Sequence, residues 1–339
     1  MNSLFRKKEE WFTFYDGKGN PIERKTEIRY DPLTEESSRI VFDPGMSLTP
    51  PDYTEAAKQT SGKNCPFCPE NVHKLTPTFP KEIAENGRIS HGQSIVCPNL
   101  FPYSKHNGVV IFSEDHYVPL SDFTNSMIKD AFTAAQTYIK QVMTVEKKPL
   151  FASINWNYLP YSGGSILHPH LHVIVSESAT NYQRLMETKA REFTKTHNKE
   201  YFTYLYETEK KEGTRWIGEK GNIAWMHAYA PKAHNDFIAV FPNKISFQDI
   251  KEKDWDDFAQ GLQAILATLD EQGLASFNMM LNFSKEATPI HARLTPRLTL
   301  GDLHTSDINF FQMLQEEPLT YKIPEDIAEK ARIHFSNIN

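Results

Sequence analysis

One order of sequence features occurs twice in this chain, and this internal repeat is the strongest constraint on its fold. His106-Asn107 stands before an apolar run at 109–112, and His234-Asn235 stands 128 positions later before a second run at 237–241. Apolar residues at helical spacing follow each run. Those of the second half lie 127 positions after those of the first, as the pairs Ile128 and Trp255, Ala131 and Phe258, Ala135 and Leu262, Tyr138 and Ile265, Ile139 and Leu266, and Val142 and Leu269.

Strand-like segments and histidines continue the repeat. In the first half the predicted helix begins near Ser121 or Asp122, either of which could cap it, and strands are expected at 151–155 and 171–175. In the second half a strand is expected at 277–282, and His291-Ala292-Arg293-Leu294 then stands where His170 to Val173 stood. We therefore predict a duplicated α+β fold in which each half is an antiparallel sheet crossed by a helix.

The duplication divides the expected fold into residues 1–205 and 206–339. The two halves should pack as one body, because each alone would leave sheet edges uncovered. The charged segment 210–220 is expected to be a surface loop between them. The first 60 residues are polar and contain turn sequences such as Asp43-Pro44-Gly45 and Thr49-Pro50-Pro51, which predict an irregular segment.

Composition restricts the class of protein. The chain has 339 residues, of which 39% are hydrophobic, and a formal net charge of −6. This balance is typical of a globular protein and disfavours a broad nucleic-acid surface. No signal peptide and no membrane span is recognisable. Cysteines occur only at positions 65, 68 and 97, too few for a disulfide framework. We expect a cytoplasmic protein that binds neither nucleic acid nor a membrane.

The motif Cys65-Pro66-Phe67-Cys68 is a candidate metal site, because two thiolates at this spacing can converge on one tetrahedral ion. Redox chemistry is the alternative. No second motif of this kind occurs, so the remaining ligands would be histidines or carboxylates. His116, after the first strand, and His168 would complete a closed Cys2His2 site, which is the pattern of a structural metal.

The run His168-Pro169-His170-Leu171-His172 is the candidate catalytic element. Alternate residues of a strand face one side, so the three histidines project together. Gly163-Gly164-Ser165 precedes the run and lets backbone N–H groups approach a phosphate closely. A neutral imidazole beside such a loop can attack phosphorus and hold a nucleotide covalently. A three-histidine metal site is the alternative.

Several of these motifs together resemble one known family. The stretch Asn157-x5-Gly163-Gly164-Ser165-x2-His168-Pro169-His170 resembles the active-site signature of galactose-1-phosphate uridylyltransferases, within the histidine-triad superfamily. Arg29-Tyr30-Asp31-Pro32-Leu33-Thr34 is similar to the opening motif of that family, and Asn99-Leu100-Phe101-Pro102 is similar to its nucleotide-binding motif. The resemblance covers most of the chain.

The resemblance implies a fold of two histidine-triad-like half-barrels, the first of them catalytic, and a role for each matched residue. His170 would take a nucleoside monophosphate from a sugar-nucleotide, releasing a sugar 1-phosphate, and a second sugar 1-phosphate would then accept it. One structural zinc ion would be bound by Cys65, Cys68, His116 and His168. The phosphates and the charge of the transition state would be held by Asn157, Gly163, Gly164 and Ser165, and the nucleoside by Asn99 and Phe101. Members of the family commonly form homodimers, which is also expected here.

His172 departs from the transferase pattern, in which glutamine usually stands two residues after the nucleophile. Glutamine can only hydrogen-bond a phosphate, whereas histidine can also give a proton to a leaving group. A nucleotidyltransferase is the favoured hypothesis. The alternatives are a hydrolase or phosphorylase that passes the same adduct to water or phosphate, and a nucleotide-binding protein without catalysis. Because the second half offers only His291-x-Arg293 where some members bind a second metal, one metal is expected.

Overall fold

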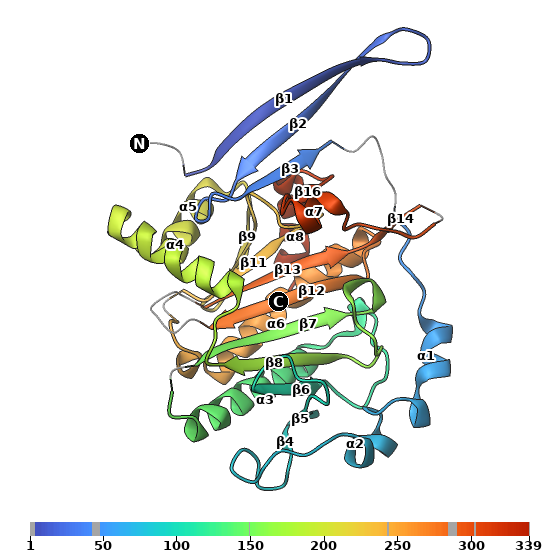
Figure 1. Cartoon of the computed structure of the whole chain (residues 1–339), viewed down its shortest axis with the longest axis vertical. Helices are drawn as coiled ribbons and strands as arrows, with labels where there is room; N and C mark the ends of the chain where they lie inside the picture. The colour runs from blue at the N-terminus through green and yellow to red at the C-terminus, as the bar shows by residue number, and fades with distance from the viewer. Residues whose placement is uncertain are drawn as a thin grey trace.

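An antiparallel ten-stranded sheet runs through the centre of the molecule (Figure 1). The computed structural model describes residues 4–42, 48–148, 150–242, 244–283, 290–301 and 303–338. From one edge of the sheet to the other the strands are β4 (Ile89–His91), β5 (Ser94–Pro98), β6 (His106–Ile111), β8 (His170–Ser176), β7 (Phe151–Tyr158), β12 (Ser276–Phe283), β13 (His291–Arg297), β11 (Phe237–Val240), β10 (Ile223–His227) and β9 (Trp216–Lys220).

The strand order confirms the internal repeat. The five strands of the first half and the five of the second follow mirrored orders outward from the central pair β7 and β12. His170 and His291 each begin their strand, β8 in the first half and β13 in the second. His172 pairs with Asn155 of β7, and Arg293 pairs with Met280 of β12, so His172 and Arg293 occupy equivalent places. The duplicated α+β architecture is therefore the one predicted. The exact division at residue 205 stays a prediction.

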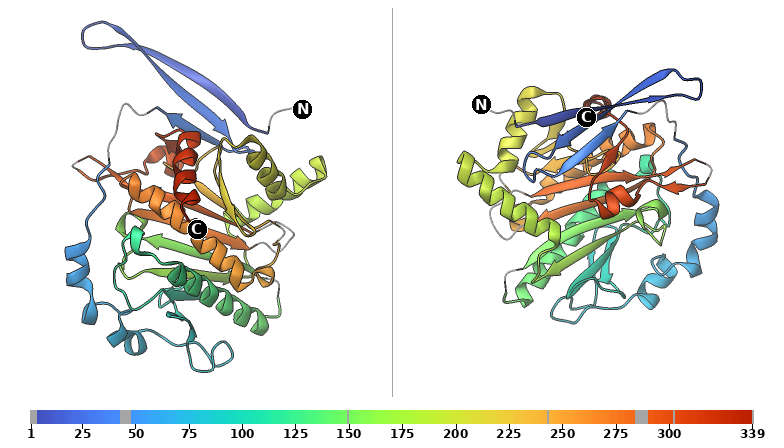
Figure 2. Two further views of the ribbon diagram at one scale, coloured as in Figure 1. Left: turned by 180° about the vertical axis from the view of Figure 1, so that it is seen from behind. Right: turned by 45° about the horizontal axis from the view of Figure 1, so that its top comes forward.

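Two long helices cover one face of the sheet. These are α3 (Asn125–Val145) and α6 (Glu252–Glu271), which lie side by side in the left view of Figure 2. The Phe132 ring packs against the Trp255 ring with centroids 5.3 Å apart. The predicted cap of the first helix was wrong, because Ser121 and Asp122 belong to the short helix η2 (Leu120–Asp122). Thr124 is the cap, and its side chain accepts a hydrogen bond from the Met127 N–H.

The opposite face of the sheet carries His170 and His172 on the first half and is covered by helices on the second half. Along β8, Leu171, Val173 and Val175 belong to the hydrophobic core beneath the helices. Since side chains alternate along a strand, His170 and His172 face the other way. On the second half this face is covered by α4 (Asn181–His197) and α5 (Tyr201–Glu212), which share a hydrophobic cluster with β10 and β11.

The N-terminal segment is not irregular, contrary to the prediction. It forms β1 (Arg6–Tyr15) and β2 (Pro21–Tyr30), a hairpin that projects from the body in Figure 1, and then β3 (Ser37–Val41), beside β16 (Leu319–Thr320). Asp16 stabilises the hairpin turn by accepting hydrogen bonds from the N–H groups of Lys18 and Asn20. β1 is exposed along nearly its whole length, so no apolar alternation marks it in the sequence. The predicted turn at 43–45 lies outside the described residues, and residues 49–51 have no regular structure.

The predicted loop at 210–220 was also wrong. Helix α5 continues to Glu212, Gly213 ends it with a φ of 75°, and β9 begins at Trp216. The charges that suggested a loop are partly structural, because Arg215 and Glu209 form a buried ion pair at 2.8 Å.

The remaining elements surround this framework. They are α1 (Thr54–Thr60), η1 (Gly62–Asn64), α2 (Pro69–Leu75), η3 (Pro160–Ser162), η4 (Phe247–Asp249), β14 (Thr299–Leu300), β15 (Thr305–Ser306), α7 (Phe310–Leu314) and α8 (Pro324–Ser336). Within the described ranges, no helix has both the length and the apolar character needed to cross a bilayer.

A buried amide joins the two halves behind the sheet. Gln136 of α3 donates hydrogen bonds to the carbonyl groups of Phe247 and Ile250 and accepts one from Trp255 Nε1 at 3.0 Å. All three partners belong to the second half. Removing this amide would leave the Ile250 carbonyl group and the Trp255 indole N–H without these partners in the interior, whereas the Phe247 carbonyl would keep the Ile250 N–H.

We therefore expect Gln136→Met, which keeps the volume, to lower the free energy of unfolding by about 3 kcal/mol. Urea unfolding followed by circular dichroism measures this change. Lys140→Met on the exposed side of the same helix is the matched control and should change stability by less than about 0.5 kcal/mol. Equal stability of the two variants would show that the amide does not couple the halves.

Candidate active site and metal cluster

The four predicted metal ligands converge in the structure. The candidate ligand atoms of Cys65, Cys68, His116 and His168 all lie within 4.8 Å of one another. Cys68 Sγ is 3.4 Å from His116 Nδ1 and 3.8 Å from His168 Nδ1. Sulfur and nitrogen ligands on a tetrahedral zinc ion would be roughly 3.6 Å apart, given the usual bond lengths. The donor set therefore fits a closed tetrahedral zinc site.

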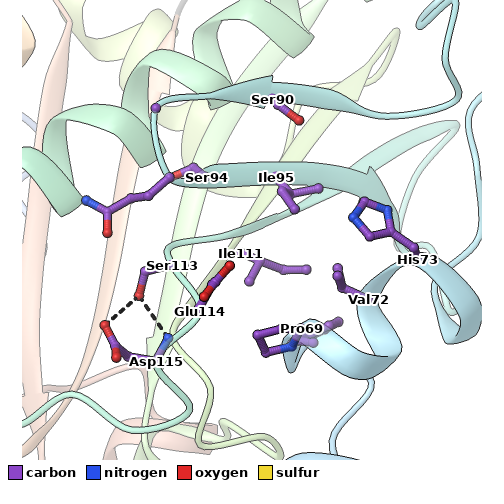
Figure 3. Close-up of a pocket in the computed structure, with 13 residues that line it drawn as sticks. Pro69, Val72, His73, Ser90, Ser94, Ile95, Ile111, Ser113, Glu114 and Asp115 are labelled. Carbon is purple, nitrogen blue, oxygen red and sulfur yellow. Dashed lines mark hydrogen bonds between the residues drawn. The ribbon is translucent and has the colours of Figure 1, made fainter.

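Neighbouring groups orient these ligands. His168 Nε2 lies 2.8 Å from the Ser113 carbonyl oxygen, to which it donates, so Nδ1 keeps its lone pair toward the thiols. Figure 3 shows Ser113 hydrogen-bonded to the backbone and carboxylate of Asp115, in the turn that leads to His116. Asn71 donates to the carbonyl groups of Gly62 and Cys65 and holds the cysteine turn.

Burial shifts the pKa values of two of the candidate ligands. Burial raises the pKa of the Cys65 thiol to about 11 and lowers the pKa of His168 to about 4. Without a cation the Cys65 thiol therefore stays protonated at neutral pH, whereas a bound zinc ion would displace its proton. The cavity drawn in Figure 3 has a volume of about 580 Å³, and Phe67, Ser113 and Asp115 are among the residues that line it. Neither His170 nor His172 lines this cavity.

All the residues predicted for catalysis and nucleotide binding line one cavity of about 290 Å³. These are Asn99, Phe101, Asn157, Gly163, Gly164, Ser165, His170 and His172. The cavity lies on the open face of the first half, where the cysteine turn and the loop after β5 reach the end of β8. Among the described residues that line it, none is Lys or Arg.

His170 is held as a neutral imidazole. Its Nδ1 lies 2.8 Å from the His168 carbonyl oxygen and donates to it, which leaves the Nε2 lone pair on a side chain that lines the cavity. Burial lowers the pKa of His170 below its ordinary 6.5, so the imidazole is unprotonated at neutral pH. Phe67 packs against it with ring centroids 5.2 Å apart. Because Phe67 stands between Cys65 and Cys68, the turn that carries these two cysteines also positions His170.

The Gly163-Gly164 loop comes close to the strand before it. A side chain at Gly164 would place its Cβ 3.0 Å from the carbonyl oxygens of Asn157 and Leu159, and Gly163 has a φ of 88°. Two hydrogen bonds from the second half hold the residue before this loop. Ser276 Oγ accepts from the Ser162 N–H, and the Asn278 side chain donates to the Ser162 carbonyl oxygen. Backbone amides at this loop are therefore fixed before any substrate arrives.

The loop after β5 forms the lip of the cavity. Asn99 donates to Asn107 Oδ1 at 2.9 Å and accepts from the Phe101 N–H, so its amide shapes the loop. Phe101 is 77% exposed and can receive a flat ring. Tyr103 was missed in the sequence, although it follows the matched motif directly. Its ring stacks on His172 with centroids 5.7 Å apart.

His172 lies beside His170 and is neutral as well. Burial lowers the pKa of His172 to about 4. Its Nδ1 is buried without a hydrogen-bond partner among the described residues. The ring centroids of His170 and His172 are 5.2 Å apart, so both reach the same part of the cavity.

The equivalent place in the second half is closed. The Tyr182 hydroxyl lies 3.1 Å from His291 Nε2, and the Phe202 ring stacks on the imidazole with centroids 4.3 Å apart. Arg293, which replaces His172, donates from Nε to both carboxylate oxygens of Asp236 at 2.8 and 2.9 Å. Helices α4 and α5 thus occupy the space that remains open in the first half.

Comparisons with known proteins agree with this architecture. No protein-family model matches the chain. A protein of Archaeoglobus fulgidus described as uncharacterized is 32% identical over 338 residues, which span 98% of this chain and 99% of that protein.

Among solved structures, an ADP-glucose phosphorylase from Arabidopsis thaliana with bound ADP-glucose superimposes with a TM-score of 0.70 at 17% identity, over 91% of this chain and 98% of that one. A GalT-like protein from the same plant gives 0.69 at 17% identity, over 90% and 98%. A uridylyltransferase gives 0.67 at 18% identity, over 92% and 99%. The fold implied by the motifs is therefore confirmed.

The metal cluster generates a direct prediction. The purified chain should contain about one equivalent of zinc, and Cys65→Ser should lose it and lower the Tm by more than about 5 °C, because metal binding stabilises the folded state. Cys97→Ala, at the buried cysteine outside the cluster, is the control and should keep the metal. Elemental analysis and thermal unfolding measure both effects, and a Cys65→Ser protein with full zinc content would contradict the ligand set.

Proposed function

This chain belongs to one family with the Archaeoglobus fulgidus protein and has the fold of uridylyltransferase-like proteins, and from this premise we propose that it transfers nucleoside monophosphates through a covalent bond to His170. The donor is a sugar-nucleotide and the acceptor a sugar 1-phosphate. The observation that carries the proposal is the His170 imidazole, which keeps one nitrogen on a backbone carbonyl and the other free in the cavity.

The reaction has two balanced steps. His170 Nε2 attacks the phosphorus attached to the nucleoside, the P–N bond forms, and the P–O bond to the sugar 1-phosphate breaks with its electron pair leaving on oxygen. A phosphate oxygen of the second sugar 1-phosphate then attacks the same phosphorus, and the P–N bond breaks. The imidazole returns to its neutral state, with the proton still on Nδ1 and donated to the His168 carbonyl oxygen.

Neutral hydrogen-bond donors would stabilise the transition state. The described residues that line the cavity include no Lys or Arg. The negative charge on the phosphoryl oxygens would therefore be stabilised by hydrogen bonds from the N–H groups of the Gly163–Ser165 loop and from the Ser165 hydroxyl. Asn157 adds an amide at the same place. Fixed dipoles in a site that excludes water are effective here because they need no rearrangement during the reaction.

A zinc ion in the Cys2His2 cluster would have a structural role. Bound by Cys65, Cys68, His116 and His168, it would tie the segment around α1 and α2 to the strand that carries His170. The cluster is coordinatively complete with these four residues, so it offers no place for a substrate.

The alternative acceptor, water or phosphate, depends on His172. Because burial lowers the pKa of His172 to about 4, its imidazole is neutral at pH 7 and acts as a hydrogen-bonding group, as glutamine would. This favours the transferase over a hydrolase that needs a proton donor at this position. A phosphorylase stays the second candidate, since the similar structure from Arabidopsis thaliana has that activity in its name.

The covalent step is tested by trapping. Incubation of the chain with radiolabelled UDP-glucose or ADP-glucose should give an adduct that is labile to acid and stable to base, as expected for a phosphoramidate. His170→Asn should abolish the adduct with an unchanged Tm, because the amide can replace the Nδ1 hydrogen bond but cannot attack. A variant labelled as strongly as wild type would remove His170 from the proposal.

Substitutions of His172 test whether a sugar 1-phosphate accepts the nucleoside monophosphate. His172→Gln should keep the exchange of label between a sugar-nucleotide and a sugar 1-phosphate within about threefold, since it conserves a neutral donor. His172→Leu, a control of similar size without a donor, should lower the exchange by about 100-fold or more. Absence of exchange in wild type, with nucleoside monophosphate or diphosphate accumulating, would establish the hydrolase or phosphorylase instead.

A further inference from the structure

A buried asparagine lies at the base of the loop after β5, which forms the lip of the catalytic cavity. Asn107 is 5% exposed and is the second residue of β6, which pairs with β8. A side chain on Gly108 would meet the Tyr138 ring of α3 at 2.9 Å. Because side chains alternate along a strand, Asn107 points to the opposite, open face, as His172 does on β8. Asn107 therefore lies on the face of the catalytic histidines, although it is not among the described residues that line the cavity.

The Asn107 amide joins the loop after β5 to the strand of the histidines. Its Oδ1 accepts hydrogen bonds from Asn99 Nδ2 at 2.9 Å and from the Tyr103 N–H at 3.2 Å. Its Nδ2 donates at 3.2 Å to the Val173 carbonyl oxygen of β8 and at 3.2 Å to the carbonyl oxygen of the next residue of β6. The Asn99 N–H also donates to the Asn107 carbonyl oxygen at 2.8 Å. One buried side chain thus fixes both ends of the lip relative to β8.

The imidazole of His172 depends on this loop for its position. Within the part of the chain that the structure describes, the buried Nδ1 of His172 has no hydrogen-bond partner. Ring contacts hold the imidazole instead. The Tyr103 ring stacks on it with centroids 5.7 Å apart and 22° between the planes, and the His170 ring meets it edge-on at 5.2 Å. Because Tyr103 is 70% exposed, its ring has little packing of its own, and the backbone of the loop decides where the ring lies.

The equivalent asparagine of the second half makes different contacts. Asn235 stands 128 positions after Asn107 and is fully buried. Its Nδ2 donates at 3.0 Å to Gln272 Oε1 at the C-cap of α6, and its Oδ1 has no hydrogen-bond partner among the described residues. The second half therefore builds the same sheet without the hydrogen bonds that Asn107 makes. This difference indicates that those bonds serve the open cavity of the first half.

We propose that Asn107 is a positioning residue for nucleotidyl transfer, which fixes the loop after β5 to β8, keeps the Tyr103 ring on His172 and so holds the imidazole toward the reacting phosphate. The inference rests on the proposed function and extends it to a residue outside the cavity. A displacement of about 1 Å in a group that contacts the transition state can lower a rate by about 100-fold, so a loop that sets the place of His172 affects the chemical step.

Single-turnover transfer of label from UDP-glucose or ADP-glucose to His170 measures this effect. At saturating donor, Tyr103→Leu should lower the rate by about tenfold or more, because His172 loses its stacking partner. Tyr103→Phe, which keeps the ring, should stay within about twofold of wild type. Asn107→Leu, of similar shape but without the amide, should lower the rate by about tenfold or more. It should also raise the donor concentration that gives half the maximal rate, since Asn99 lies in the same loop.

NMR of the histidine-labelled chain reports the position of His172 without any reaction. A stacked tyrosine ring shifts the imidazole signals of His172, which are assigned by their loss in His172→Gln. Tyr103→Leu should move these signals, and Asn107→Leu should move them in the same direction although the tyrosine is still present. Asn235→Leu is the matched control, because it removes the buried asparagine of the second half. It should leave the signals in place and the transfer rate within about twofold of wild type.

The positioning role and the proposed function fail in different ways. Unchanged His172 signals and an unchanged transfer rate in Asn107→Leu would overturn the role of Asn107 and leave the adduct at His170 standing. Equal losses of rate in Asn107→Leu and Asn235→Leu would do the same, because general destabilisation would then explain both. Equal rates in Tyr103→Leu and Tyr103→Phe would contradict the role even if Asn107→Leu does not fold. Absence of any adduct in wild type would overturn the proposed function itself, and the positioning role with it.

Discussion

The antiparallel pairing of β7 with β12 is the interaction on which the rest of the structure depends. It joins two five-stranded sheets into one, so that neither half has a free edge at the junction. It also sets Asn157 opposite Asn278, whose amides hydrogen-bond at 2.7 Å. From the same strand, Ser276 accepts the Ser162 N–H before the glycine loop. The second half therefore holds the Gly163-Gly164 loop of the first half in place.

The duplicated halves have taken different roles. In the first, the cysteine turn and the loop after β5 leave His170 in a cavity, with Phe67 packed against it. In the second, the equivalent His291 is covered by Phe202 and hydrogen-bonded by Tyr182. In our proposal His170 is the nucleophile, and the second copy provides the scaffold and the anchor of the glycine loop.

The sequence predicted those parts of the fold that depend on periodicity and on chemical motifs. Repeated apolar spacing predicted both helices and the duplication, and the motif Cys65-x-x-Cys68 with His116 and His168 predicted a cluster of ligands that the structure brings together. The β1–β2 hairpin was missed because its strands are exposed and its signal is confined to the Asp16 turn. The contact of the second half with the glycine loop was not foreseen, since it depends on pairing between strands about 120 residues apart in the sequence. The roles of the cavity residues stay predictions.

The most direct test of the account is to locate the bound nucleotide. The chain is incubated with UDP-glucose or ADP-glucose, digested at neutral to alkaline pH, and analysed by tandem mass spectrometry of the peptide that spans residues 168–172. The account predicts a nucleoside monophosphate on His170 alone, discharged when a sugar 1-phosphate is added before digestion. Modification at His172, or turnover of the sugar-nucleotide without any modified peptide, would contradict it.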